Sequence, residues 1–321
     1  MAFLTLNQTM PSIEDFFFRA LTEPNNPDAI VICNPPDAIC RAPVILHSKK
    51  HLEEHIKHIQ EHNLKKAVVI AKDISFLKHC PSLEYLWVIP ALTAIDFDFS
   101  PVYELPNLRW LQCETVIGPH DEKYARIDYS QVRHIERLAV SGAKGHENIA
   151  SLKKLRVLYM EQGQPCRDSL MGAFDGVMLE KLVICQSPIK SLNELEQAQK
   201  LCMLDLSYNK NLEDISALSA LKGSLRWLSI EQCGKISDFS ALDSLEKLEF
   251  LQLIGSNVLP NLEFVRRMPK LKSFVFKMNN SDGDMSMCSN IPYVSIRNRK
   301  HYSHKDKDFS KKEFQFVEPQ I

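Results

Sequence analysis

Two short histidine-rich segments have the spacing of metal ligands. Residues 51–55 (HLEEH) and 58–62 (HIQEH) both fit H-x-x-E-H, the inverted zinc-protease pattern. On a helix, an i, i+4 pair of histidines from one stripe can hold Zn²⁺, and the stripe comprises His51, His55, His58 and His62. The stripe borders an apolar face and the segment is rich in Lys and Glu, so a plain solvated helix also explains both matches. We favour that interpretation and expect no bound metal, with adventitious metal binding and a zinc-dependent hydrolase as the alternatives.

Other catalytic motifs are missing from the sequence. It contains no Gly-rich phosphate loop, no Gly-x-Ser-x-Gly elbow and no kinase signature. With only ten glycines, backbone cradles for anions are scarce. The tail from residue 297 is basic and contains Tyr302 and His304, but without a stacking module it is a weak indication of nucleic-acid binding. We therefore predict a non-catalytic protein without a cofactor.

The composition narrows the class of partner and the compartment. The chain has 321 residues, 45% of them apolar and 25% charged, and a net charge of −1. Near-neutrality argues against duplex DNA or an anionic membrane as a bulk partner. No run is long enough to span a membrane, and the first eighteen residues lack the Lys or Arg of a secretory signal. The nine cysteines are odd in number and contain no Cys-x-x-Cys, which predicts reduced thiols in a cytoplasmic protein.

A six-residue phrase organises most of the chain. It consists of an apolar residue, two variable ones, an apolar one, a variable one and an apolar one. Eleven copies begin at Leu64, Leu83, Leu108, Ile135, Leu155, Leu179, Leu201, Leu225, Leu248, Leu271 and Ile291. Successive starts lie 19 to 27 residues apart, so each repeat is one supersecondary unit that stacks on its neighbours.

The clearest copies resemble a known family of repeats. Residues 201–221 (LCMLDLSYNKNLEDISALSAL) and 225–245 (LRWLSIEQCGKISDFSALDSL) look like the 22-residue leucine-rich repeats of internalins and of phosphatase regulatory subunits. The resemblance implies an α/β fold: a right-handed horseshoe-shaped solenoid with a parallel sheet on the concave face and short helices or turns on the convex face. It also implies an asparagine-ladder column, in which Cys233 departs from the family; the column contains Asn209, Cys233, Ser256 and Asn279.

We predict three regions along the chain. Residues 1–63 form an N-terminal capping segment, with a helix over 12–21, strands over 29–33 and 43–47, and the His-rich helix over 49–62. Residues 64–296 form the array of about eleven repeats. Residues 297–321 form a polar, basic tail that ends the array as a cap and then becomes flexible.

Strand alternation sorts the side chains of each phrase. Positions 4 and 6 face the core, so positions 3, 5 and 7 face outward on the concave side. All three tryptophans of the chain fall in these outward columns. Exposed aromatics on a rigid surface suit protein binding, although aromatics that merely pack on cross-strand neighbours are the alternative. The predicted partner-binding residues are Tyr85, Trp87, Trp110, Gln112, Glu114, Tyr159, Glu161, Asp205, Trp227, Glu231, Phe250 and Tyr293.

These features together predict an interaction protein. Four acidic residues lie in the middle of the outward columns, which suggests a protein partner with a basic surface docked by charge steering. Solvated charges that keep the sheet soluble are the alternative. We expect a monomer that captures its partner on the concave face, and one hypothesis is that it inhibits this partner as an immunity protein neutralises a toxin. A targeting or regulatory subunit of a cytoplasmic enzyme is the second interpretation.

Overall fold

The computed structural model describes residues 29–34, 51–94, 96–117, 123–142, 144–161 and 177–312. The expected helix over 12–21 and the expected strand over 43–47 lie outside these residues. The chain divides into two compact units, which meet in the sequence between Pro165 and Cys166.

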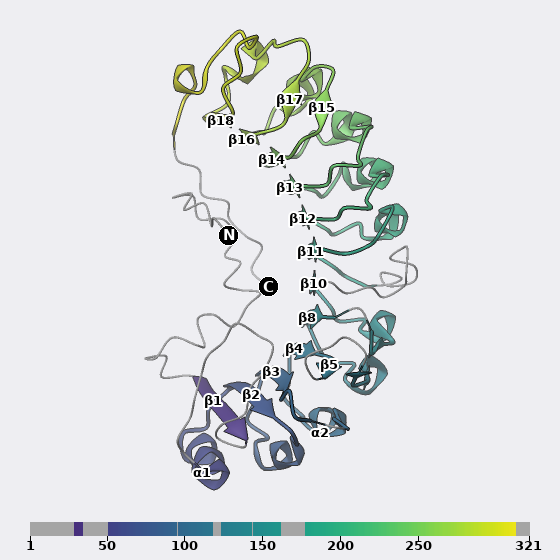
Figure 1. The fold of residues 1–321 in the computed structure, drawn as a ribbon, viewed down its shortest axis with the longest axis vertical. Coiled ribbons are helices and arrows are strands. Elements are labelled where there is room, and N and C mark those ends of the chain that lie inside the picture. Colours follow the sequence, from purple (N-terminus) through teal and green to yellow (C-terminus); the bar gives the residue numbers. More distant parts are fainter. Residues whose placement is uncertain are drawn as a thin grey trace. The chain divides into compact units, whose positions relative to one another are not determined.

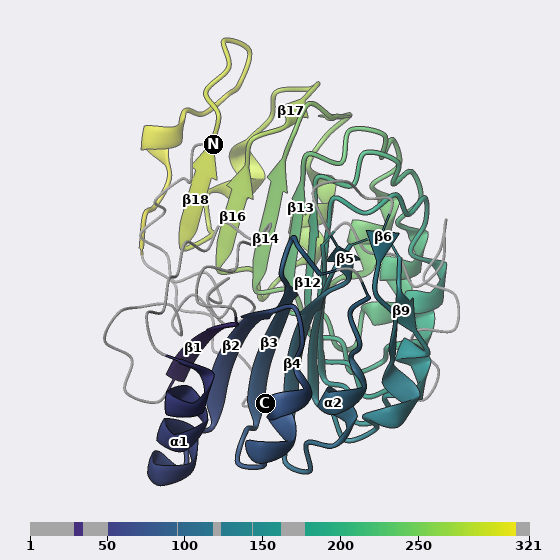
Figure 2. The same ribbon diagram turned by 60° about the horizontal axis from the view of Figure 1, so that its bottom comes forward.

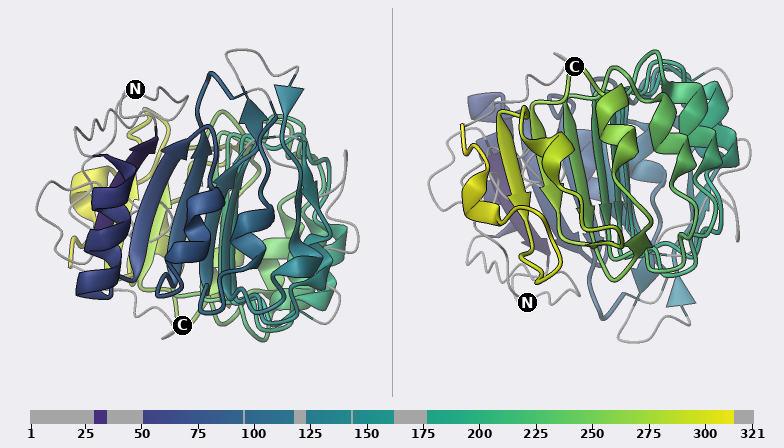
Figure 3. Two further views of the ribbon diagram at one scale, coloured as in Figure 1. Left: turned by 90° about the horizontal axis from the view of Figure 1, so that it is seen from below. Right: turned by 90° about the horizontal axis from the view of Figure 1, so that it is seen from above.

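The first unit is built on parallel strands that are neighbours in the order β1, β2, β3, β4, β8 and β10 (Figure 1). They span Ala29–Asn34, Lys66–Ala71, Tyr85–Pro90, Trp110–Glu114, Arg137–Ser141 and Val157–Glu161. Shorter strands are β5 (Val116–Ile117), β6 (Lys123–Tyr124), β7 (Ile127–Asp128) and β9 (His146–Glu147). The helices are α1 (Leu52–His62), η3 (Ser75–His79), α2 (Ser100–Tyr103), η4 (Tyr129–Gln131) and η5 (Ile149–Ser151). In the left view of Figure 3, helices of this unit lie along one face of its sheet.

The second unit repeats the arrangement. Figure 2 shows β12, β13, β14, β16 and β18 side by side. With β11, these parallel strands span Lys181–Cys185, Met203–Ser207, Trp227–Glu231, Phe250–Ile254, Ser273–Phe276 and Tyr293–Ile296. A small pair is formed by β15 (Val258–Leu259) and β17 (Asn279–Asn280). The 3-10 helices are η6 (Asn193–Gln197), η7 (Ser216–Leu221), η8 (Ser240–Ser244), η9 (Glu263–Arg267), η10 (Ser286–Cys288) and η11 (Asp306–Asp308).

The phrase and the strands coincide. From Lys66 to Ile296, every strand of the two parallel arrays begins at position 3 of a phrase. The side chains at positions 4 and 6 are all at most 3% exposed, from Ala67 and Val69 to Val294 and Ile296. Alternation along a strand therefore places positions 3, 5 and 7 on the opposite face, which we call the outer face. The predicted separation of core from outer face is confirmed.

Turns leading into the short helices share a motif that the sequence interpretation overlooked. Six described turns carry Asp-x-Ser, with the Ser amide donating to an Asp carboxylate oxygen at 2.8–2.9 Å. The six pairs begin at Asp73, Asp98, Asp128, Asp214, Asp238 and Asp284. This Asx-turn fixes the backbone where the helix starts. At Asp128, hydrogen bonds from Asn148 and Ser130 lower the carboxyl pKa to about 2.

Buried side chains in the turns that follow the strands hydrogen-bond to the backbone and form a ladder. They occupy only some of the predicted positions. Buried Asn209 accepts from the Ser187 amide at 2.9 Å and donates to the Ile184 carbonyl at 2.8 Å. Cys233 makes two long contacts, from Sγ to the Leu206 carbonyl at 3.5 Å and to the Glu231 carbonyl at 3.4 Å. The prediction for Ser256 and Asn279 is wrong by one residue.

In these two repeats the next residue along the chain, Asn257 or Asn280, makes the buried hydrogen bonds to the backbone. Ser256 is exposed, whereas buried Asn257 donates to the carbonyls of Cys233 and Ile236 at 3.1 and 2.8 Å. Asn280 rather than Asn279 is fully buried, and its side-chain Nδ2 donates to the Asp284 carbonyl at 2.9 Å. A Cβ at Gly255 would lie 2.9 Å from Asn257 Oδ1, so this glycine gives the shifted asparagine its room.

The β1 edge of the 12-stranded parallel sheet follows the sequence interpretation in part. The strand expected over residues 29–33 is present as β1, which pairs in parallel with β2, Ala29 opposite Lys66. The His-rich helix is present as α1, which begins at Leu52 and contacts β1. The Glu54 carboxylate accepts from the His51 amide at 2.9 Å at its start.

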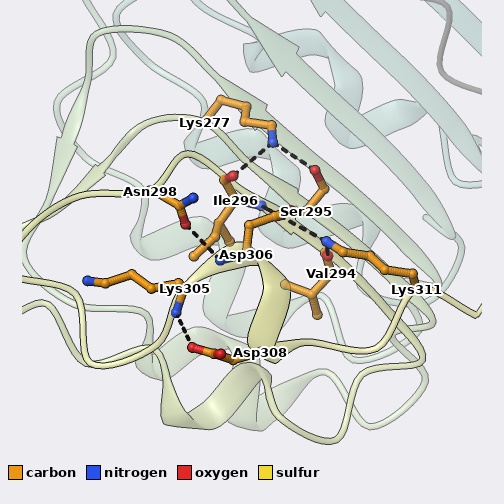
Figure 4. Close-up of polar contacts among 9 residues, drawn as sticks. All are labelled: Lys277, Val294, Ser295, Ile296, Asn298, Lys305, Asp306, Asp308 and Lys311. Carbon is orange, nitrogen blue, oxygen red and sulfur yellow. Dashed lines mark hydrogen bonds and ion pairs between the residues drawn. The ribbon is translucent and has the colours of Figure 1, made fainter.

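The β18 edge of the 12-stranded parallel sheet is covered by residues that follow β18 (Figure 4). The Val294 amide donates to the Ser310 carbonyl at 3.1 Å, and the Ile296 amide donates to Asp306 Oδ1 at 2.7 Å. Lys311 donates to the Val294 carbonyl and to Asp306. These bonds pair backbone groups that an open edge strand would expose. The predicted boundaries between the three regions, after residues 63 and 296, stay predictions.

Candidate functional site

The strand register converts each outward column into a row of neighbouring side chains. In the second unit Met203 lies opposite Trp227 and Trp227 opposite Phe250, and in the first unit Tyr85 lies opposite Trp110. Position 5 and position 7 residues form their own rows in the same way. The predicted site residues of each unit therefore share the outer face of that unit's sheet.

In the first unit a row of rings and cations crosses four strands. The rings of Tyr85 and Trp110 meet edge to face, with centroids 5.6 Å apart. Lys66 Nζ lies 5.5 Å from the Tyr85 centroid, and the Arg137 guanidinium lies 5.1 Å from the Trp110 centroid. All four side chains are partly exposed. A row of this kind is a rigid, amphipathic contact surface.

Beside this row lies an apolar cluster. Trp87 packs with Val68, Ile70, Ile89 and Cys33 from adjacent strands, and only 4% of its surface is exposed. The expectation of exposed aromatics is therefore wrong for Trp87. Gln112 and Tyr159 are also buried on this face, at 4% and 7%. These strands carry apolar residues on both faces, so the sequence could not distinguish an exposed aromatic from one packed on its neighbours.

The aromatic residues of the second unit pack in the same way. The Trp227 and Phe250 rings stack with centroids 4.9 Å apart and an interplanar angle of 3°, and Met203 extends the cluster. Trp227 is 3% exposed and Phe250 6% exposed, so the expectation of exposure is wrong here too. Their predicted position on the outer face is correct.

Two acidic residues lie on neighbouring strands, Asp205 in the middle of β12 and Glu231 at the carboxyl end of β13. The Ser207 hydroxyl donates to Asp205 Oδ1, and the Tyr208 hydroxyl donates to Glu231 Oε1 at 3.1 Å. Burial raises the pKa of Asp205 to about 6; the nearby Glu231 charge adds to this, while Ser207 and Lys181 oppose it. Tyr208 has a left-handed φ of 58°, which is unusual for tyrosine and sets its ring beside Glu231.

The other predicted acids belong to the first unit. Glu114 lies opposite Ser141, and Ser141 lies opposite Glu161, so the two glutamates flank one strand. Burial raises the pKa of Glu161. Tyr293, on β18, forms an isolated antiparallel β-bridge with Lys311. The Lys311 ammonium lies 5.6 Å from the centroid of the Tyr293 ring. The predicted acids thus fall into two groups, one on each unit.

Comparison with solved structures identifies the fold of the chain. The chain aligns with an internalin, InlF of Listeria monocytogenes, at a TM-score of 0.56 and 18% identity, covering 90% of this chain and 87% of that one. The chain has the leucine-rich-repeat fold. Other similar structures are InlJ of Listeria monocytogenes (TM-score 0.48, 16% identity, covering 71% and 52%) and a leucine-rich-repeat protein of Leptospira interrogans (TM-score 0.48, 16% identity, covering 80% and 70%). No protein-family model and no curated protein sequence matches the chain.

The four histidines of residues 51–62 differ in burial and spacing. His55 is buried in α1, whereas His51 and His62 are exposed. The His58 and His62 rings lie 4.2 Å apart, and His62 Nδ1 is 3.1 Å from the His58 carbonyl oxygen. Among the described residues, no three His, Cys, Asp or Glu side chains are grouped so as to hold a metal ion. No helix of the described part is long and apolar enough to cross a membrane.

A buried polar chain in the first unit was missed by sequence reasoning. Cys113 Sγ lies 3.0 Å from the Tyr129 hydroxyl, which lies 2.8 Å from His146 Nδ1. His146 Nε2 lies 3.3 Å from the Ser141 carbonyl, so that nitrogen carries the proton. Burial lowers the pKa of His146 to about 4 and raises that of Cys113 to about 12. A histidine with a lowered pKa and a thiol with a raised pKa both stay neutral near pH 7, so we assign the Cys113–Tyr129–His146 hydrogen-bond chain a structural role.

Proposed function

We propose that this protein binds a partner protein on the outer faces of its repeat sheets and is not an enzyme. The observation that carries the proposal is the row of Lys66, Tyr85, Trp110 and Arg137, whose partly exposed rings and cations are held rigid across four strands. Rigid aromatic and arginine side chains supply contact area at low conformational cost.

The acids of the outer face support a partner with a basic surface. Asp205 and Glu231 in the second unit, and Glu114 and Glu161 in the first, are partly buried rather than extended into solvent. Acidic residues whose only role is to keep a surface soluble do not need to be partly buried in the face of a sheet. In its specific form the proposal is inhibition of a basic enzyme in the cytoplasm, as an immunity protein neutralises a toxin. The alternative is a regulatory subunit of a cytoplasmic enzyme.

Charge reversal on the outer face tests the proposal. Glu231→Lys changes an acid of β13, and Glu196→Lys makes the same change at an exposed residue of η6. Wild type and both variants are immobilised, and proteins captured from the native lysate are quantified. We expect at least one specific partner that Glu231→Lys loses and Glu196→Lys retains. A partner retained by both variants, or lost only with Glu196→Lys, contradicts docking of a basic partner on the acids of the second unit's outer face.

A further inference from the structure

Four larger side chains surround Ser229 on the outer face of the second unit. The register places Asp205 of β12 directly opposite Ser229 of β13, and Ser229 directly opposite Gln252 of β14. Trp227 and Glu231 are the next outer-face residues on either side of Ser229 along β13. Diagonal neighbours on a sheet face lie within reach of long side chains. A small hydroxyl thus lies at the centre of these four residues, which we call the Ser229 ring.

Two acids of the Ser229 ring lack a matched cation among the described residues. Asp205 and Glu231 approach closely enough for the Glu231 charge to oppose ionisation of Asp205. The cation that acts on Asp205 from β11 is Lys181, whose effect is the smallest of those on this carboxyl, and the Cys233 thiol lies near the same acid. The Ser207 and Tyr208 hydroxyls donate to these carboxylates but bring no positive charge.

Gln252 gives an independent indication of a ligand. Its Nε2 donates to Ser229 Oγ at 3.1 Å, which directs the amide towards the centre of the Ser229 ring. Gln252 is only 2% exposed, so its Oε1 is shielded from water. This oxygen has no hydrogen-bond partner among the described residues. A buried acceptor left unpaired is unfavourable, so an occupant that donates to it is favoured.

We propose that the Ser229 ring binds an arginine side chain of the partner protein, with the guanidinium on the Asp205 and Glu231 carboxylates. Guanidinium presents several donors in one plane that match two carboxylates, whereas an ammonium is a compact, strongly hydrated charge. The Gln252 acceptor receives a further donor of the same partner segment. This inference rests on the proposed function and names the group that the outer face recognises.

The test uses a minimal probe on the full chain. N-acetyl-arginine amide is titrated into ¹⁵N-labelled protein, and amide chemical shifts are followed; N-acetyl-citrulline amide, which is neutral and nearly isosteric, is the control ligand. We expect shifts at Ser229, Asp205 and Glu231, and at least tenfold weaker binding of the citrulline ligand. Absence of shifts at these residues up to the solubility of the probe overturns the proposal.

Two variants locate the site. Asp205→Asn together with Glu231→Gln removes both charges with little change of volume, and Glu196→Gln removes one charge on η6. The double variant should bind the arginine probe at least tenfold more weakly, while Glu196→Gln binds it as wild type does. Thermal melting verifies that each variant is folded. Equal binding by the double variant rejects the arginine site, and the proposed function still stands if Glu231→Lys alone loses the captured partner.

Discussion

The indole of Trp227 lies parallel to the ring of Phe250, with their centroids 4.9 Å apart, on two adjacent strands of the outer face. The two rings thus support each other before any partner arrives. A surface of this kind is preorganised, since little side-chain freedom remains to be lost on binding.

The stack makes a measurable contribution to stability. Trp227→Ala and Phe250→Ala should each lower the free energy of unfolding, because each leaves a cavity in a packed cluster. In a double-mutant cycle the two changes should couple by about 0.5–1.5 kcal/mol, the usual range for stacked aromatic pairs. Urea unfolding of wild type, both single variants and the double variant gives the coupling. Strictly additive losses would show that the stack is only a coincidence of neighbours.

Asp205 should make the protein less stable as pH rises. Its folded-state pKa of about 6 exceeds the ordinary 3.8, so the folded state binds the proton more tightly. The stabilisation is complete below pH 3.8 and is lost as pH rises through 6. Asp205→Asn lacks this titration, so relative to wild type its unfolding free energy should rise by at most about 3 kcal/mol between pH ~4 and ~7. A constant difference across that range contradicts the burial of this charge.

His146 has the opposite dependence on pH. Burial depresses its folded-state pKa from 6.5 to about 4, so the unfolded state binds the proton more tightly between these values. Its contribution to stability is complete above pH 6.5 and falls by about 3 kcal/mol as pH approaches 4. His146→Gln should remove this part of the acid sensitivity, measured by urea unfolding at several pH values. An unchanged pH slope in the variant would exclude the buried histidine as its origin.

The shifted ladder can be tested with two adjacent residues. Asn257→Ala leaves the carbonyls of Cys233 and Ile236 without their donor and should cost about 1–3 kcal/mol. Ser256→Ala alters an exposed residue and should stay within about 0.5 kcal/mol of wild type. Thermal and urea unfolding of both variants decide the matter. A larger loss for Ser256→Ala would restore the ladder position that the family pattern implies.

Asp306 holds the cap on the last strand. Asp306→Ala removes the acceptor of the Ile296 amide and the carboxylate partner of Lys311, so unfolding free energy should fall by about 1–3 kcal/mol. The exposed β18 edge should also promote self-association, which light scattering detects. Asp243→Ala, which breaks an exposed ion pair with Arg267, is the control and should change neither property.

The sequence contained enough information to predict the core of this fold and the side of each strand. A strict alternation around residues such as Leu204 and Leu206 has one solution in a stacked sheet, because a slip of one residue would expose the core. It was not enough to predict how much of the outer face is open. Trp87 and Trp227 fit an exposed anchor and a packed ring equally well in a linear pattern, and only the contacts across strands distinguish them.

Other parts of the site depend on geometry between distant residues. Cys113, Tyr129 and His146 have no common spacing, and their chain forms only because β9 and η4 bring them together. The ladder shifts by one residue because Gly255 leaves room for Asn257, and no family pattern carries that detail. The Asp-x-Ser turns, by contrast, are visible in the sequence and were available as helix-start signals.

Oxidative footprinting of side chains with and without the captured partner tests the central claim most directly. Tyr85 and Trp110 report on the outer face, and Tyr103 of α2 and Tyr124 of β6 report on other parts of the first unit. We predict that the partner slows oxidation of Tyr85 and Trp110 and leaves Tyr103 and Tyr124 unchanged. Protection of Tyr103 or Tyr124 with none at Tyr85 and Trp110 would contradict binding at the outer face.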